Sequence, residues 1–167
     1  MPVQRLNHAV LYVRDLERSV GFYTDALGFR VKTQVPGRAA FLQAEASTND
    51  HDLGLFAIGT QAGDSPAGRS TVGLYHLAWE VDTLAELRRI AEVLRARDSL
   101  VGASDHGTTK AIYARDPDGI EFEVSWLLPA DLLSDDFTMR TEPLDLEAEI
   151  ARYGAQTRGG VGVSVPA

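Results

Sequence analysis

The chain has 167 residues, of which 44% are hydrophobic and 24% are charged, a composition ordinary for one globular domain with a buried core. Its formal net charge of −8 gives no electrostatic basis for binding nucleic acid, and no apolar run is long enough to cross a membrane. The first ten residues lack the pattern of a signal peptide, so we expect a cytoplasmic protein. The absence of cysteine excludes disulfides and thiolate ligands, so any bound metal must use histidine and carboxylate side chains.

The first predicted elements are a buried strand over residues 6–13 and an amphipathic helix after it. Asp15 is placed to cap the helix, and Gly28 is placed to end it. The apolar stripe of this helix repeats at helical spacing and consists of Leu16, Val20, Tyr23 and Leu27. Three short strands are expected to follow, over residues 29–33, 39–43 and 51–58.

A second copy of this pattern follows a Gly- and Pro-containing linker at residues 59–72. Its first strand, over residues 74–81, carries histidine at its third position, as the first strand does, so His76 repeats His8. Thr83 and Glu86 form a capping box that begins the second helix. Strands are expected over residues 99–103, 110–115 and 120–126, with a strong turn signal at residues 116–119.

Two β-α-β-β-β units therefore predict an α+β fold at residues 1–127, with units at about 4–58 and 73–127. We expect them to form one eight-stranded, partly open, barrel-like sheet around a metal cleft. Residues 128–167 are interpreted as a C-terminal extension. It contains a short helix near residues 144–153 and a flexible tail from about residue 159.

The residues that suggest chemistry are two histidines and a pair of acids on predicted strands. Alternate residues of a strand share a face, so His8 and His76 are expected to meet if the two units pack as a pseudo-symmetric pair. Glu121 and Glu123 share a face of the last strand, and spacing alone does not choose between them. Two imidazoles and one carboxylate form a facial triad that leaves open positions on a non-haem Fe(II).

A structural role is the alternative for each of these residues. A lone histidine in an apolar strand is more often a satisfied core or edge residue than a ligand, and the two acids are also compatible with a solvated strand face. His51 and His106 follow polar runs and are compatible with simple loop positions. Tyr113 fits a half-buried strand without any further function.

The start of the chain and its paired units resemble the vicinal oxygen chelate superfamily, which includes glyoxalase I, antibiotic-resistance proteins and type I extradiol dioxygenases. Residues 6–8, Leu-Asn-His, with the run from Asp15 to Phe29, are typical of its beginning. The resemblance covers about residues 4–127. Within it, the second half is most similar to a one-domain catechol 2,3-dioxygenase: the matching residues are His106, Ile112-Tyr113, Asp116-Pro117-Asp118-Gly119 and Glu123. The segment from His51 to Phe56 resembles the part that carries a further active-site histidine.

The resemblance implies a metal, Fe(II) or alternatively Mn(II), on His8, His76 and Glu123, with Glu123 preferred over Glu121. It implies cleavage of a catechol-type aromatic diol by O₂ next to the two hydroxyls. His51 would act on the oxygen and deliver a proton, while His106 and Tyr113 would hydrogen-bond the substrate oxygen and assist its deprotonation. Two departures stand out: Ser104 lies where the family signature usually has another residue, and the chain has one pair of units where well-known members have two.

Two other function classes remain open at this point. One is a metal-dependent isomerase or lyase of the glyoxalase kind, which uses four ligands and has no required equivalent of His106 with Tyr113. The other is a small-molecule-binding resistance protein without catalysis. For assembly, open sheet edges favour a homodimer or a higher even homo-oligomer.

Overall fold

The computed structural model describes residues 2–3, 5–67, 70–133 and 140–160. The chain divides into two compact units. Unit 1 comprises Met1–Ser65 together with the turn Asp116–Gly119, and unit 2 comprises Pro66–Arg115 together with Ile120–Ala167. No helix of the described part is long and apolar enough to cross a membrane.

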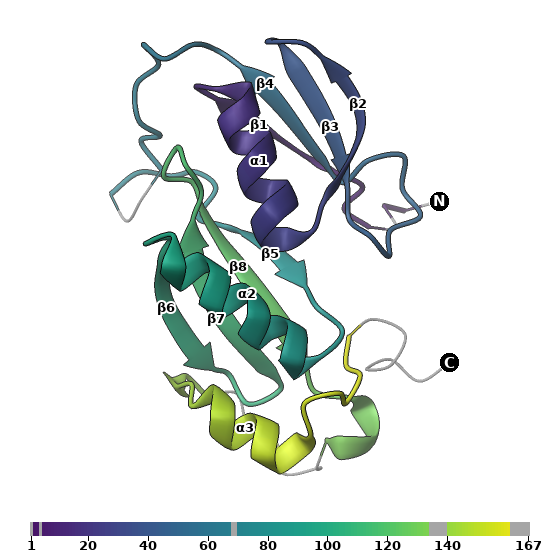
Figure 1. Cartoon of the computed structure of the whole chain (residues 1–167). Coiled ribbons are helices and arrows are strands. Elements are labelled where there is room, and N and C mark those ends of the chain that lie inside the picture. The colour runs from purple at the N-terminus through teal and green to yellow at the C-terminus, as the bar shows by residue number, and fades with distance from the viewer. Residues whose placement is uncertain (1, 4, 68–69, 134–139, 161–167) are drawn as a thin grey trace. The chain divides into compact units, whose positions relative to one another are not determined.

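Unit 1 is a four-stranded sheet covered on one face by a helix (Figure 1). Its elements are β1 (Ala9–Val13), α1 (Leu16–Leu27), β2 (Arg30–Val35), β3 (Ala39–Gln43) and β4 (Leu53–Ala57), and the strand order is β1-β4-β3-β2. The Asp15 side chain accepts a hydrogen bond from the Arg18 N–H at the start of α1, and Gly28 ends the helix with a φ of 73°. The predicted caps are therefore confirmed, and the stripe residues Leu16, Val20 and Tyr23 are buried.

Unit 2 repeats this order and adds a fifth strand. Its elements are β5 (Leu77–Glu80), α2 (Leu84–Ala96), β6 (Leu100–Asp105), β7 (Thr109–Arg115) and β8 (Glu121–Leu127). The fifth strand is β9 (Glu142–Pro143), and the sheet order is β5-β8-β7-β6-β9. Thr83 caps α2 by accepting a hydrogen bond from the Glu86 N–H at 3.2 Å. α2 packs on the sheet of this unit through buried side chains, which are Leu84, Leu87, Leu94, Ile112, Phe122, Val124 and Trp126.

The α+β class and both β-α-β-β-β units are confirmed, with two differences from the sequence prediction. The strands of the described residues form two hydrogen-bonded sheets of four and five strands, where a single eight-stranded sheet was expected. His8 and His76 lie directly before β1 and β5, and not inside a strand, because the pairing with β4 and β8 begins at Ala9 and Leu77. Each histidine therefore directly precedes the first strand of its unit.

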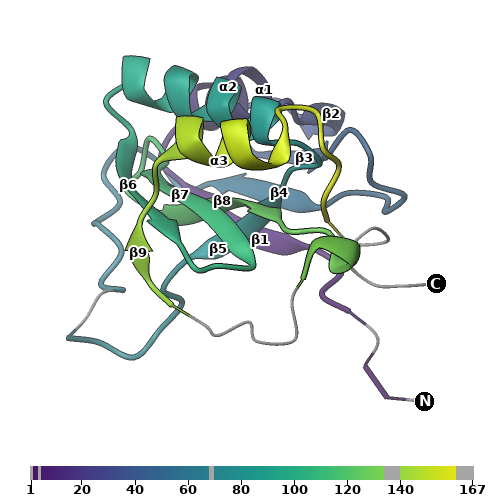
Figure 2. The same ribbon diagram turned by 90° about the horizontal axis from the view of Figure 1, so that it is seen from below.

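The C-terminal extension packs onto unit 2 (Figure 2). After the short 3-10 helix Ala130–Leu132, β9 (Glu142–Pro143) pairs with the edge strand β6, and α3 (Leu146–Tyr153) lies beside α2. The chain then returns along the sheet, where the Trp126 indole N–H donates to the Thr157 carbonyl at 3.1 Å. The predicted helix is confirmed near its predicted bounds, and its apolar side has a place within the same unit.

The predicted flexible tail differs from the structure at its first two residues. Gly159 and Gly160 are buried, and the Gly159 N–H donates to the Asp82 carbonyl at 2.9 Å. A Cβ on Gly159 would collide with the Leu127 main-chain carbonyl, so only glycine allows this close approach. The rest of the predicted tail, residues 161–167, lies outside the described residues.

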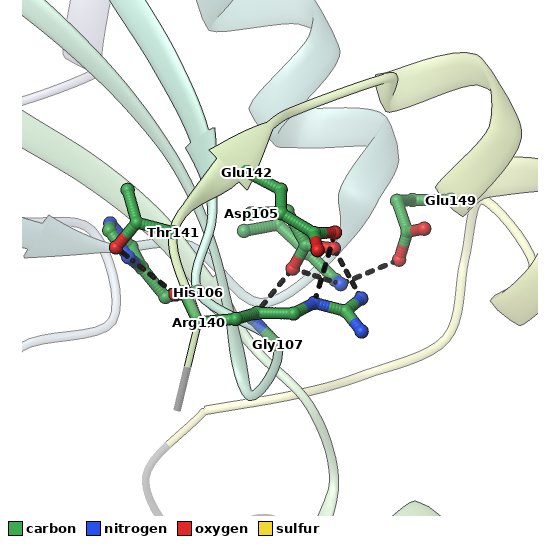
Figure 3. A network of polar contacts seen from close by, with 8 residues as sticks. Asp105, His106, Gly107, Arg140, Thr141, Glu142 and Glu149 are labelled. Atoms are coloured by element: carbon green, nitrogen blue, oxygen red, sulfur yellow. Dashed lines mark hydrogen bonds and ion pairs between the residues drawn. The ribbon is translucent and has the colours of Figure 1, made fainter. Parts of the chain in front are cut away.

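A buried lysine joins the extension to the sheet, and Figure 3 shows its partners Asp105 and Glu149. Lys110, on β7, is fully buried and its Nζ lies 2.6 Å from Asp105 Oδ1 and 2.7 Å from Glu149 Oε2 on α3. Arg140 adds a second cation 2.7 Å from Asp105 Oδ2. Burial by itself would raise the pKa of Asp105, but hydrogen bonds from Lys110, Arg140 and the Gly107 N–H outweigh it and lower this pKa to about 2. A buried lysine is tolerated only with such partners, so the extension completes the environment of Lys110.

The Asp105 carboxylate should make folding stability depend on pH. Its pKa falls from an ordinary value of 3.8 to about 2 on folding, so its contribution is full above pH 3.8 and is lost as pH falls through about 2. The unfolding free energies of the wild type and of Asp105→Asn, measured in urea, should therefore differ most above about pH 5. Their difference should shrink by about 2 kcal/mol by about pH 2, at about 1.4 kcal/mol per pKa unit.

The matched control for this measurement is Asp131→Asn, at an exposed position of the same extension. Its difference from the wild type should stay nearly constant over the same pH range. A constant difference for Asp105→Asn as well would contradict the ion-paired network around Lys110.

The predicted homodimer stays a prediction. The argument from open sheet edges is weaker than expected, because β9 covers the edge of β6 and α3 contacts α2.

Candidate metal centre and acid–base residues

The clearest pair of ligand side chains lies in unit 2. Ala78 of β5 stands opposite Glu123 of β8 in the parallel register, and His76 precedes β5 by one residue. The residues on either side of Glu123, Phe122 and Val124, are buried on the α2 side, so the Glu123 carboxylate lies on the opposite face of the sheet. His76 Nε2 lies 3.2 Å from Glu123 Oε2, and both side chains are largely buried.

This spacing suits a shared divalent ion. Two ligand atoms bound at right angles, each at about 2.1 Å from the ion, lie about 3 Å apart. The other ring nitrogen of His76, Nδ1, is buried and has no hydrogen-bond partner among the described residues. The donor set of one imidazole and one carboxylate therefore fits a metal of the Fe(II) or Mn(II) kind.

Glu121 occupies a different environment. Its Oε2 lies 3.6 Å from Arg115 Nη2, on the neighbouring strand. Of the two acids that spacing leaves open, the structure brings Glu123 to a histidine and Glu121 to an arginine.

His106 and Tyr113 form a hydrogen-bonded pair next to Glu123. Tyr113 of β7 stands directly opposite Glu123 in the antiparallel register, and its hydroxyl lies 2.8 Å from His106 Nε2. Burial, followed by the negative charge of Glu123, raises the pKa of Tyr113. The phenol therefore stays protonated at neutral pH and is available as a hydrogen-bond donor.

His8 and His51 come together in unit 1. Their ring centroids are 4.5 Å apart, and the Phe41 ring lies 5.0 Å from that of His51. Val10 and Tyr12, which share a strand face with His8, are exposed, whereas Leu11 and Val13 between them are buried on the α1 side. This group therefore lies on the sheet face that α1 leaves uncovered.

The predicted residues are thus gathered in two sets: His76, Glu123, His106 and Tyr113 in unit 2, and His8 and His51 in unit 1. Within the ranges that the structure describes, no cluster of three or more histidine and acidic side chains is close enough to hold a metal ion. Phe41 contacts His51 from β3. Arg140 and Thr141 reach His106 from 34 and 35 residues away, and no local signal in the sequence predicts these two contacts.

The strand registers of the two units differ at one informative position. Val10 stands opposite Gly54 in unit 1, where Ala78 stands opposite Glu123 in unit 2. Phe41 stands opposite Gly54, as Tyr113 stands opposite Glu123. Both units therefore have a histidine before their first strand, whereas the carboxylate of unit 2 has glycine as its counterpart in unit 1.

Comparison with known proteins gives the same picture of the fold. The family described as "Glyoxalase/Bleomycin resistance protein/Dioxygenase superfamily" matches residues 5–124. The chain is 27% identical over 92% of its length to a catechol-2,3-dioxygenase of Bacillus subtilis, and 35% identical over 69% of its length to biphenyl-2,3-diol 1,2-dioxygenase 3 of Rhodococcus globerulus. It spans only 53% and 59% of these two relatives.

Among solved structures, the fold is similar to that of a lactoylglutathione lyase from Agrobacterium tumefaciens. The TM-score is 0.54 and the identity 24%, over 75% of this chain and 95% of that chain. The match of the family model over most of the chain and the repeated β-α-β-β-β units lead to one conclusion: the chain belongs to the glyoxalase/bleomycin resistance protein/dioxygenase superfamily, whose members include metal-dependent enzymes and dioxygenases.

Proposed function

We propose that the chain is an extradiol dioxygenase, which uses O₂ to open the ring of a catechol-type aromatic diol next to its two hydroxyls. Fe(II), with Mn(II) as the alternative, is held by His8, His76 and Glu123. The observation that carries the proposal is the Tyr113–His106 hydrogen bond of 2.8 Å, directly across the strand pair from Glu123. An acid–base pair beside a metal ligand is the arrangement that substrate deprotonation needs.

The number of available ligands favours an extradiol dioxygenase over an enzyme that needs a four-ligand site. His76 and Glu123 supply two ligands within unit 2, and His8 is proposed as the third because it holds the equivalent position before β1. A bound divalent ion would lower the pKa of a coordinated substrate hydroxyl. With three protein ligands, it would also have coordination positions open for substrate oxygens and O₂. Gly54, which stands where a fourth ligand would lie in unit 1, has no side chain to occupy such a position.

The side chains of this chain handle the protons. The Tyr113 hydroxyl oxygen and His106 Nε2 lie 2.8 Å apart. In the proposed mechanism Tyr113 donates its hydroxyl hydrogen to Nε2, and its phenol oxygen accepts a hydrogen bond from a substrate hydroxyl. His106 then takes up the proton through Tyr113, and an imidazole suits this role because it can both accept and release a proton. His51, whose ring contacts those of His8 and Phe41, is proposed to deliver a proton to oxygen.

The alternative is another metal-dependent reaction of the superfamily, an isomerisation or a lyase reaction on a small chelating substrate. The fold similarity to a lactoylglutathione lyase is its support. Such a reaction has no use for O₂, which makes the two functions easy to separate.

The decisive experiment is an oxygen-uptake assay. The protein is loaded anaerobically with Fe(II), or with Mn(II) in parallel, mixed with each of a panel of catechols, and then exposed to O₂. Equimolar O₂ uptake with a yellow ring-opened product is the expected result. A protein that binds the metal stoichiometrically but takes up no O₂ with any catechol would favour the alternative.

Measurements of bound metal should distinguish the three proposed ligands from the neighbouring Glu121. His8→Ala, His76→Ala and Glu123→Ala should each lose stoichiometric metal after dialysis while circular dichroism shows a folded protein. Glu121→Ala is the matched control. It removes a glutamate carboxylate two residues from Glu123, on the same strand, and should retain the metal. Loss of metal in Glu121→Ala with retention in Glu123→Ala would mean that the proposed ligand is wrong.

His51, His106 and Tyr113 should behave as acid–base groups and not as ligands. His51→Gln, His106→Gln and Tyr113→Phe should keep the metal content of the wild type but lower kcat by about 10²–10⁴, the usual range for such groups. Metal analysis and steady-state kinetics on the same samples check this. Full activity in a double variant with His51→Ala and His106→Ala would contradict the acid–base roles proposed for these two histidines.

A further inference from the structure

The His106 ring is held at both of its nitrogens. On one side, Nε2 lies 2.8 Å from the Tyr113 hydroxyl. On the other side, Nδ1 lies 3.3 Å from the main-chain carbonyl oxygen of Arg140 and 3.2 Å from Thr141 Oγ1 (Figure 3). Arg140 and Thr141 belong to the C-terminal extension, outside the residues 5–124 that the family model matches.

The chemistry of these partners determines where the ring proton lies. The Arg140 carbonyl oxygen can only accept a hydrogen bond, whereas the Thr141 hydroxyl can accept or donate one. The contact with the carbonyl is therefore a hydrogen bond only when Nδ1 carries the hydrogen, with the Thr141 oxygen as a second acceptor. In the neutral ring this leaves Nε2 with its lone pair free to accept from the Tyr113 hydroxyl. The partners at Nδ1 therefore select the tautomer in which Nε2 is the base.

The extension holds this carbonyl in place through several contacts. The Arg140 guanidinium lies 2.7 Å from Asp105 Oδ2, next to His106 in sequence. Ser104 and Asp105 pair with Pro143 and Glu142 of β9, directly after Thr141. Asp105 is itself held by the buried Lys110. The pairing of β9 with β6 and the ion pair of Arg140 with Asp105 thus hold the Arg140 carbonyl in position.

We propose that Arg140 and Thr141 are positioning residues that set the tautomer and orientation of His106, so that the C-terminal extension completes the acid–base pair. The effect on turnover rests on the proposed function, whereas the effect on the tautomer does not. Thr141 acts through its hydroxyl, and Arg140 acts through its carbonyl, which its side chain anchors.

The test compares four variants of the full chain. Thr141→Val removes the hydroxyl at nearly the same shape, and Thr141→Ser restores it. Arg140→Gln breaks the ion pair with Asp105 and loosens the carbonyl. Glu147→Gln is the control, since it lies on exposed α3 of the same extension and its carboxylate pairs with Arg88, away from His106.

Two readouts are measured on each protein. Nitrogen-15 NMR of histidine-labelled protein, loaded with diamagnetic Zn(II), reports which His106 nitrogen carries the hydrogen. Steady-state kinetics of the Fe(II)-loaded protein with the catechol that it cleaves fastest report kcat and KM separately.

The wild type should show hydrogen on Nδ1 of His106. Thr141→Val and Arg140→Gln should show a mixture of tautomers and a kcat lowered by about tenfold, the effect of one hydrogen bond, with KM and metal content unchanged. Thr141→Ser and Glu147→Gln should match the wild type in both readouts.

Three results would overturn the inference: hydrogen on Nε2 in the wild type, an unchanged His106 signal in both Thr141→Val and Arg140→Gln, or a Thr141→Ser variant as impaired as Thr141→Val. A wild type that cleaves no catechol but shows the expected tautomer shifts would instead count against the proposed function alone.

Discussion

The register of β5, β8 and β7 places Ala78, Glu123 and Tyr113 in one row across the sheet of unit 2. A slip of one residue in β8 would turn Glu123 toward α2 and bring Phe122 or Val124 to the open face. The register is held because Phe122, Val124 and Trp126 are buried, and a slip would expose all three together. Apolar burial on one face of β8 thus determines which polar side chains meet on the other.

The two units use the same fold for different side chains. At the row that carries Glu123 and Tyr113 in unit 2, unit 1 carries Gly54 and Phe41. Unit 1 therefore has glycine and phenylalanine where unit 2 has a carboxylate and a phenol. Both units have a histidine directly before their first strand. Unit 1 therefore offers an aromatic surface around His8 and His51, and unit 2 offers the hydrogen-bonding groups.

Local signals in the sequence predict most of the fold. Asp15, Gly28 and Thr83 have the cap roles that their residue types favour, and the strand Ala39–Gln43 has its predicted bounds. The exact start of β1 and β5 was not predictable, since it depends on pairing with β4 and β8 and not on local composition. The preference for Glu123 over Glu121 came from a family pattern, and the structure gives it a physical basis in the contact with His76.

The extension was predictable only as a short helix. β9 has two residues, one of them proline, and forms only because the edge of β6 is available to pair. Lys110 would be assigned to a solvated position from its type alone, and its burial depends on Glu149, which is 39 residues away in the sequence. Sequence periodicity does not predict contacts of this range, which include those of Arg140 and Thr141 with His106.

The burial of Trp126 gives the protein an internal optical probe. Its indole is fully buried, packs 5.8 Å from the Tyr153 ring and donates to the Thr157 carbonyl, so two of its neighbours belong to the extension. The other tryptophan, Trp79, is half-buried on β5. Local opening of the extension would admit water to Trp126 and shift its emission to longer wavelength while the rest of unit 2 stays folded. Intrinsic fluorescence can therefore follow the detachment of residues 140–160 in real time, without any label.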